Sequence, residues 1–394
     1  MKRRSAQAGL SLIETVIGLA LGLIALLVIV QAFTSIRQFT AASSGQADAQ
    51  QRGTIASWRL LRELRMAGAG IGHGPTLWGC RLNAWRDGVA FLPRPTAWPA
   101  PFDNLPTTLR LVPIAVSDDT GPHGSDQLLV MTARGAAGTA PATTSVASGT
   151  MVRSGSTAGY RVGDLLLMTD ATSVADCQVG QVDASYLAPA GVAAPSDVPT
   201  GAAGTRYNAP TGFSNLPQPG DYSMINLGST PTIQMIGIDD DRRLLLYDAM
   251  GMMTGADPVV LAENVHQLQV LYGLDDGVSG GVANDNVVDR WVSPGGAWAF
   301  AAVHSAATNA LAIKAIRIAI VTRSATPQGR TGPATITLFE DLPAASQVTI
   351  TPSLADRQYQ FQIHDSVIAL RNETAALCAE HRRLSGVPAA AACD

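Results

Sequence analysis

The sequence has few charged residues, few cysteines and almost no lysine. Asp, Glu, Lys and Arg make up 15% of its 394 residues, against roughly 25% in an average soluble domain, whereas apolar residues make up 46%. This balance excludes a wholly disordered chain, which combines low hydrophobicity with high net charge. Lys2 and Lys314 are the only lysines among 27 basic residues, and 31 acidic residues give a net charge of −4. The lack of a basic excess argues against a general nucleic-acid binder.

The cysteines are too sparse for a disulfide scaffold, but they suit an oxidising compartment. There are four of them, Cys80, Cys177, Cys378 and Cys393. Three pairings are possible. We favour Cys80–Cys177 with Cys378–Cys393, because the second bridge would hold an otherwise frayed tail; free thiols are the alternative. Zinc is disfavoured, since no Cys-x-x-Cys spacing occurs.

Hydrophobicity is concentrated near the N-terminus. Residues 15–36 carry no charge, and 12 of the 18 residues from Val16 to Phe33 are Leu, Ile, Val or Phe. A run of about 20 apolar residues crosses a bilayer as a helix. Basic residues at positions 2–4 precede this run, and the positive-inside rule keeps such a leader cytoplasmic. We therefore predict one pass through the inner membrane, with the C-terminus in the periplasm.

A single acid, Glu14, stands at the entrance to this apolar helix. A carboxylate in a membrane or a dry helical bundle is costly and needs a partner. Cleavage of the Gly9–Leu10 bond would place a new α-amino group one helical turn from Glu14. A secretory signal would have a shorter, acid-free apolar region of about 7–15 residues. A plain signal anchor gives no reason for the acid.

The run from Ala8 to Glu14, Ala-Gly-Leu-Ser-Leu-Ile-Glu, resembles the class III signal of type IV prepilins and pseudopilins. The resemblance implies that a prepilin peptidase cuts after Gly9 and N-methylates Leu10. It also implies that Glu14 sets axial register by pairing with the α-ammonium of a neighbouring subunit. Leu10 replaces the usual Phe, and Ser11 stands where Thr is common; both are mild departures. The local alternative is that Glu14 is satisfied at the headgroups or by its own helix N-terminus.

The helical pattern continues beyond the apolar run. Ile36, Phe39, Ile55, Trp58, Leu61 and Leu64 recur at three-residue steps, the spacing of one helical face. A helix from about Leu10 to Met66 would measure about 85 Å, and its second half can pack on a sheet. Ser43-Ser44-Gly45 and Gly53 weaken its middle. Glycines from Gly68 onward, followed by Pro75, end it.

The rest of the chain is expected to be rich in strands. Apolar and alternating runs predict strands at 109–116, 126–133, 164–169, 177–182, 233–238, 243–247, 265–272, 315–322 and 358–363. Two segments rich in Ala, Gly, Pro, Ser and Thr, about 135–159 and 184–220, are expected to be long loops. The predicted fold is α+β and pilin-like. Its long N-terminal helix, transmembrane in the first half, packs on an antiparallel β-sheet that carries a loop-rich β insertion.

Several later segments resemble PilW-type minor pilins. They are Leu61 to Gly68 near the helix end, Ala262 to Asp275, Ile316 to Ser324, and Arg357 to Asn372. This resemblance implies a low-abundance subunit that takes part in type IV pilus assembly and initiation near the tip. The implied partners are other minor pilins, the major pilin and a PilY-type tip adhesin. Residues 80–260 resemble little that is known.

An acidic loop offers a weak candidate calcium site. Asp275, Asp276, Asp285 and Asp289 supply oxygen ligands in a Gly-rich segment, although their spacing is not that of an EF-hand. A solvated acidic turn is the commoner arrangement. The letters Gly-x-Ser-x-Gly occur in this loop around Ser279, away from a strand-to-helix elbow, and no phosphate-binding loop occurs. We predict no enzyme, no catalytic residue and no cofactor.

The expected division has four parts: a leader peptide at 1–9, a transmembrane or filament-core helix at 10–36, the soluble half of that helix at 37–67, and a periplasmic or extracellular globular domain at 68–394. Loss of the three leader cations would bring the side-chain charge to 24 minus 31, or −7, so no nucleic-acid partner is expected. The resemblance implies final placement in the pilus at the cell surface. A minor pseudopilin of a type II secretion system and a pilus-tip ligand-binding module are the alternatives.

Overall fold

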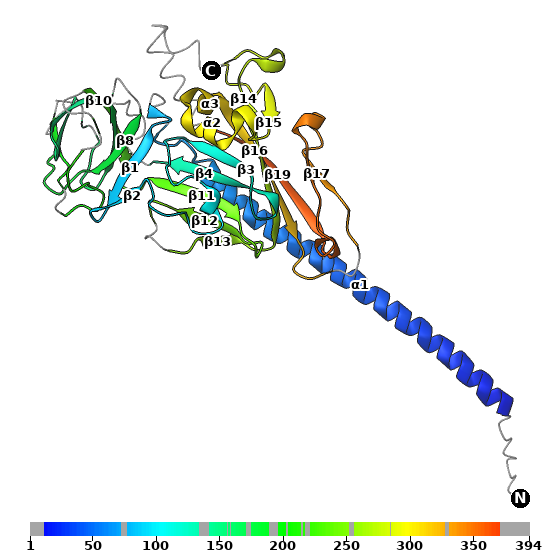
Figure 1. Ribbon diagram of the computed structural model, residues 1–394. Coiled ribbons are helices and arrows are strands. Elements are labelled where there is room, and N and C mark those ends of the chain that lie inside the picture. The colour runs from blue at the N-terminus through cyan, green and yellow to red at the C-terminus, as the bar shows by residue number, and fades with distance from the viewer. Residues whose placement is uncertain are drawn as a thin grey trace, which may run out of the picture.

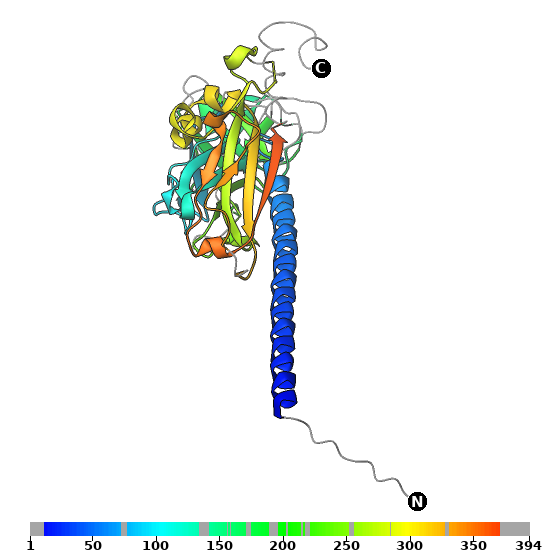
Figure 2. The same cartoon turned by 90° about the vertical axis from the view of Figure 1, so that its right-hand side faces the viewer.

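One uninterrupted helix carries the globular part of the protein. The computed structural model describes residues 12–71, 77–133, 142–155, 157, 159–170, 175–188, 196–201, 204–213, 216, 221–251, 256–283, 285–327 and 331–370. Helix α1 runs from Leu12 to Leu64, about 80 Å at 1.5 Å per residue. Its first half projects into open space and its second half lies along the strands (Figure 1 and Figure 2). The weak positions predicted at 43–45 and at Gly53 do not break it.

Nearly all the remaining regular structure is β. The strands are Arg81–Arg86 (β1), Val89–Leu92 (β2), Ile114–Gly121 (β3), Ser125–Thr132 (β4), Ala142–Ser148 (β5), Met151–Ser154 (β6), Leu165–Asp170 (β7), Asp176–Gln181 (β8), Ser196–Pro199 (β9), Asp221–Gly228 (β10), Thr232–Ile238 (β11), Leu244–Asp248 (β12), Val259–Ala262 (β13), Val265–Leu274 (β14), Arg290–Val292 (β15), Ile313–Arg323 (β16), Ile336–Leu338 (β17), Val348–Ile350 (β18) and Phe361–Ala369 (β19). Two short helices, Phe300–Ser305 (α2) and Ala307–Ala312 (α3), precede β16. The protein is therefore α+β, as the sequence predicts.

The strands form four sheets in the described part of the chain. An eight-stranded sheet has the order β2-β1-β8-β7-β10-β5-β6-β9, and a five-stranded sheet has the order β13-β12-β11-β4-β3. A four-stranded sheet has the order β15-β14-β16-β19, and β17 pairs with β18 alone. All the pairings are antiparallel except that of β1 with β8, which is parallel. The expectation of purely antiparallel sheet fails only at that pair.

Most predicted strands are confirmed, and two are misplaced. The strand expected at 109–116 begins instead at Ile114, because Pro113 has no N–H to donate to a ladder. The strand expected at 358–363 begins at Phe361 and extends to Ala369. Its bounds follow its pairing with β16, in which Phe361 lies opposite Arg323 and Ala369 opposite Ala315.

The segments 135–159 and 184–220 are not simply long loops. The first contains β5 and β6, and the second contains β9. All three strands lie at one end of the eight-stranded sheet, where β6 pairs with both β5 and β9. β5 and β6 pair with each other as a hairpin, and the more distant strands β10 and β9 supply the outer ladder hydrogen bonds.

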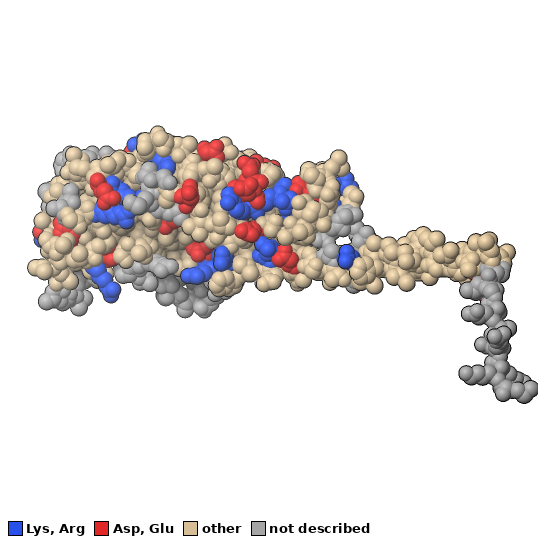
Figure 3. Space-filling view, turned by 90° about the horizontal axis from the view of Figure 1, so that it is seen from below, with Lys and Arg blue, Asp and Glu red and all other residues tan. Residues whose placement is uncertain are grey.

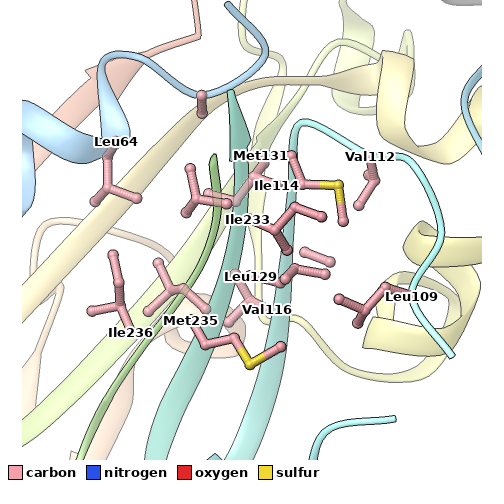
Figure 4. Close-up of a cluster of buried hydrophobic side chains, with 14 of the residues drawn as sticks. Leu64, Leu109, Val112, Ile114, Val116, Leu129, Met131, Ile233, Met235 and Ile236 are labelled. Carbon is pink, nitrogen blue, oxygen red and sulfur yellow. The ribbon is translucent and has the colours of Figure 1, made fainter. Parts of the chain in front are cut away.

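A continuous apolar core joins the end of α1 to the sheets. Leu64 of α1 belongs to the same buried cluster as Met131 of β4, Ile114 of β3 and Ile233 of β11 (Figure 4). All four side chains are buried. Full burial of one such side chain contributes roughly 1.5–3 kcal/mol. The second half of the helix is therefore part of the folded domain.

Candidate functional site

The projecting half of α1 is the first part of the candidate site. The segment Leu12–Arg37 is the one helical stretch among the described residues that is long and apolar enough to cross a membrane, and none of it is buried. Its 26 residues span about 39 Å at 1.5 Å per residue, more than the roughly 30 Å of a hydrocarbon core. Figure 3 shows this rod almost free of charged residues, which gather on the globular part. An apolar surface of this size needs a membrane or a protein partner.

Glu14 lies in the first turn of this projecting helix and is exposed. No described cation lies within ion-pair distance of its carboxylate. A helix N-terminus favours an acid in its first turn by about 0.3–1 kcal/mol. That gain is small beside the cost of a carboxylate in hydrocarbon, so the local interaction leaves most of the cost uncompensated.

The second half of α1 meets the sheets through small residues. The buried positions follow one helical face, Ala49, Ala56, Leu60 and Leu64, and Gly53 lies between them. At Gly53 a Cβ atom would lie 1.8 Å from Nε2 of His364 in β19. A larger residue at this position would require the His364 side chain to move. We call this contact between the second half of α1 and the strands the seam. The spacing of small residues at steps of three and four is the sequence pattern that could have predicted it.

Hydrogen bonds to the strands hold the helix along this seam. The hydroxyl of Thr322 in β16 donates to the carbonyl oxygen of Ala49 at 3.0 Å. Nη1 of Arg59 donates to the carbonyl oxygen of Leu261 in β13 at 2.6 Å. The helix is therefore held by strands of two different sheets.

The prediction of which helical face packs on the sheet is partly wrong. Trp58 is 63% exposed and Ile55 is 42% exposed. Leu64 is buried as expected, and Leu61 packs at the edge of the core. The three-residue spacing drifts around a helix that has 3.6 residues per turn, so these six positions do not share one face. Ile55 and Trp58 instead give the second half of α1 an outward apolar patch.

A disulfide bridges Cys80 and Cys177, which are 97 positions apart, with a Cα–Cα distance of 5.5 Å. Both side chains are fully buried. Cys177 lies in β8, opposite Leu82 of β1 in the one parallel pair. Cys378 and Cys393, the other expected pair, lie outside the described residues, as do Gly9 and Leu10.

The four aspartates of the acidic loop are used within the loop. Asp289 accepts hydrogen bonds from the backbone N–H groups of residues 276 and 277, at 3.0 and 2.7 Å. Asp275 accepts one from residue 286 at 2.8 Å. Asp285 bonds the N–H of residue 287 at 2.9 Å. The Arg290 guanidinium hydrogen-bonds Asp276 at 2.5 Å and lowers the pKa of that carboxyl. These bonds hold the shape of the turn.

Three other carboxylates lie close enough together to hold an ion, namely Asp118, Asp119 and Asp126, the only such group among the described residues. The buried Asp126 accepts hydrogen bonds from the N–H groups of Asp119, at 2.9 Å, and Val270, at 2.7 Å. Burial raises the pKa of Asp126 well above its ordinary value. Its structural role is to tie the β3–β4 connection to β14.

Two buried histidines make stability depend on pH. Burial, followed by the nearby charge of Arg242, lowers the pKa of His266 to about 4. Burial and Arg110 lower the pKa of His304 to about 4. Nε2 of His304 accepts the backbone N–H of Arg110 at 2.7 Å, which an imidazolium cannot do. Both rings are therefore neutral in the folded protein.

The free energy of unfolding is expected to fall as the pH drops from about 6.5 to about 4. Unfolded histidines have a pKa near 6.5, so the unfolded state binds protons first across this window. Each histidine removes roughly 3 kcal/mol over the full interval. Denaturant unfolding at several pH values measures the slope. His266→Phe should reduce it, whereas the exposed His123→Asn should not; equal slopes in all three proteins would contradict the assignment.

One family model matches part of the chain. It is described as "Type IV Pilus-assembly protein W", and it covers residues 230–372. The match supports a PilW-like pilus protein with a role in type IV pilus assembly, which implies contact with other assembly components. The description names no enzymatic activity. No curated protein and no solved structure matches the chain.

The match falls on one region of the fold. Residues 230–372 contain β11 to β19, including the whole four-stranded sheet along which α1 lies. Three of the four segments that resemble PilW-type proteins in the sequence become neighbouring strands there, β14, β16 and β19, whereas the segment from Leu61 to Gly68 lies at the end of α1. Every strand of the eight-stranded sheet precedes residue 230. The PilW-like part thus contains the strands that contact the helix, β13, β16 and β19.

Proposed function

We propose that this protein is a minor pilin that takes part in the assembly and initiation of type IV pili near the pilus tip. It is made as a prepilin with a leader at 1–9, cleaved after Gly9 and N-methylated on Leu10. Before assembly it sits in the inner membrane with its C-terminus in the periplasm, and it then passes into the pilus at the cell surface. The observation that carries the proposal is the exposed apolar rod with Glu14 in its first turn, attached to a sheet that the PilW model matches.

The packing of α1 supports a pilin-like arrangement. Half of the helix is embedded against β13, β16 and β19, and half projects with its apolar side chains exposed. In a filament the projecting halves would bundle, and the outward patch of Ile55 and Trp58 would extend the contact toward the globular part. Burial of such surface stabilises association by roughly 25 cal/mol per Å².

The proposed partners follow from the same features. A prepilin peptidase would process the leader, and the α-ammonium of a neighbouring pilin would pair with Glu14. Other minor pilins and the major pilin would contact the apolar rod, and a PilY-type adhesin would sit with them at the tip. A minor pseudopilin of a type II secretion system would share the N-terminal half. The description of the matched family favours the pilus.

Mass spectrometry of the mature N-terminus tests the processing step. The protein purified from pilus-bearing cells should begin with N-methylated Leu10. Gly9→Val should retain Met1 and the leader, whereas Ala8→Val, one residue away, should still be processed. An intact Met1 in the unaltered protein would exclude a prepilin.

A further inference from the structure

A pocket between the eight-stranded and five-stranded sheets combines cations with aromatic rings. It has a volume of about 430 Å³, within the range of small-molecule sites. The β1–β2 hairpin and the loop after β2 form one wall, and residues at the end of β12 form the floor. Figure 1 shows β2 and β12 away from the projecting half of α1. The pocket therefore stays open when that helix is embedded.

The pocket is lined by aromatic rings. Trp98 and Tyr247 are buried and meet edge to face, with ring centroids 6.0 Å apart. The indole N–H of Trp98 donates to the carbonyl of Pro106 at 2.9 Å. Phe91 and the exposed Val89 add apolar surface to the wall. This surface suits a ring-shaped body that presents C–H groups.

The cations outnumber the acid in the lining. Arg86, Arg94 and Arg206 line the pocket together with one carboxylate, Asp87. The local charge is thus three minus one, or +2, in a protein whose net charge is −4. Such a site attracts an anion.

Each guanidinium is stacked on an aromatic ring. The Cζ atom of Arg86 lies 4.4 Å from the Phe91 ring centroid, and that of Arg94 lies 4.9 Å from the Trp98 centroid. Arg206 lies over Tyr207 at 5.6 Å. Stacking fixes the plane of a guanidinium and leaves its edge for bidentate binding of a carboxylate or phosphate.

Two of these cations have donors to spare. Arg94 uses Nε to bond the carbonyl of Ala97 at 3.1 Å and Nη1 to bond the Tyr247 hydroxyl at 3.3 Å, and its Nη2 has no partner among the described residues. The guanidinium of Arg206 makes only a loose ion pair with Asp87, at 3.7 Å, within that same part of the chain. Arg86, by contrast, is engaged with the carbonyls of residues 249 and 250.

We propose that this pocket binds a hexuronic acid residue of an acidic polysaccharide, with the sugar carboxylate on Arg94 and Arg206 and the ring against Phe91 and Val89. A nucleic acid would need a continuing track of cations along its phosphates. Here the three arginines line one pocket together with Asp87. The apolar wall favours a sugar ring over a bare inorganic anion.

Calorimetric titration of the full chain in detergent micelles tests this assignment, with D-galacturonate as the probe and D-galactose as its uncharged match. Charge-assisted hydrogen bonds are worth about 1.5–3 kcal/mol. Galactose, Arg94→Gln and Arg206→Gln should therefore each weaken binding by roughly tenfold or more. Asp87→Asn should strengthen binding, because it removes a like charge from the lining. Arg153→Gln, an exposed arginine of β6, should leave binding unchanged.

Other results would overturn the assignment. Equal binding of galactose and galacturonate would show that the pocket does not recognise the carboxylate. Tighter binding of inorganic phosphate or of a single-stranded oligonucleotide would assign the pocket to phosphate. Weaker binding after Asp87→Asn, or equal loss in Arg153→Gln, would place the site elsewhere. Arg206 is exposed, so its variant keeps the test valid even if Arg94→Gln impairs folding.

Discussion

Glu14→Ala is expected to abolish incorporation of the protein into pili. If the proposed pairing with a neighbour's α-ammonium holds, the substitution leaves that ammonium buried and uncompensated, which costs about 3–5 kcal/mol. Such a cost shifts the partition between membrane and filament by roughly 150- to 5,000-fold. Immunoblots of sheared pili and of the membrane fraction measure that partition.

Glu340→Ala is the matched control, since it removes an exposed acid from the globular part. It should leave the pilus fraction unchanged. Membrane insertion of Glu14→Ala should also be normal, because loss of an acid favours insertion. Unchanged incorporation and piliation in Glu14→Ala would contradict the electrostatic docking of subunits.

Removal of the Cys80–Cys177 bridge is expected to give the largest loss of stability. The bridge joins residues 97 positions apart, and closing a loop of about that length stabilises the folded state by roughly 4 kcal/mol. The Cys80→Ala/Cys177→Ala protein should therefore melt roughly 8–15 °C lower. Thermal unfolding of the full chain in detergent measures the change.

Reduction of the unaltered protein provides the control for this change. It should lower the melting temperature by a similar amount, because it removes the same cross-link without altering the packing of the side chains. Reduction should not lower the melting temperature of the double variant by this amount, because that variant already lacks the Cys80–Cys177 bridge. A double variant with the same melting temperature as the unaltered, oxidised protein would show that the bridge adds nothing to stability.

The sequence predicts central strands better than peripheral ones. β14 and β16 are buried along most of their length, so apolar runs reveal them. β9, Ser196–Pro199, has no such run and pairs only with β6. A strand of this kind is specified by its distant partner, which a local pattern cannot express.

The candidate sites also differ in how far the sequence predicts them. Glu14 and the apolar rod are readable because a charge beside a long apolar run is a local pattern. The stacked arginines are not, since Arg94 and Arg206 lie far apart in the sequence and line one pocket only in the folded protein. The Asp87-Gly88 dipeptide, a known hairpin signal, was the one local indication of that pocket. The outward position of Trp58 likewise depends on which helical face the sheets cover.

The unbroken course of α1 has a mechanical consequence. No linker separates the apolar rod from the seam with β16 and β19, so tension applied to the rod passes directly into the sheet. Figure 2 shows the helix running nearly along these strands. Force in that direction loads many interstrand hydrogen bonds at once instead of opening them one by one. The seam around Gly53 would therefore transmit the force from the rod to the sheet in a subunit that must withstand pulling.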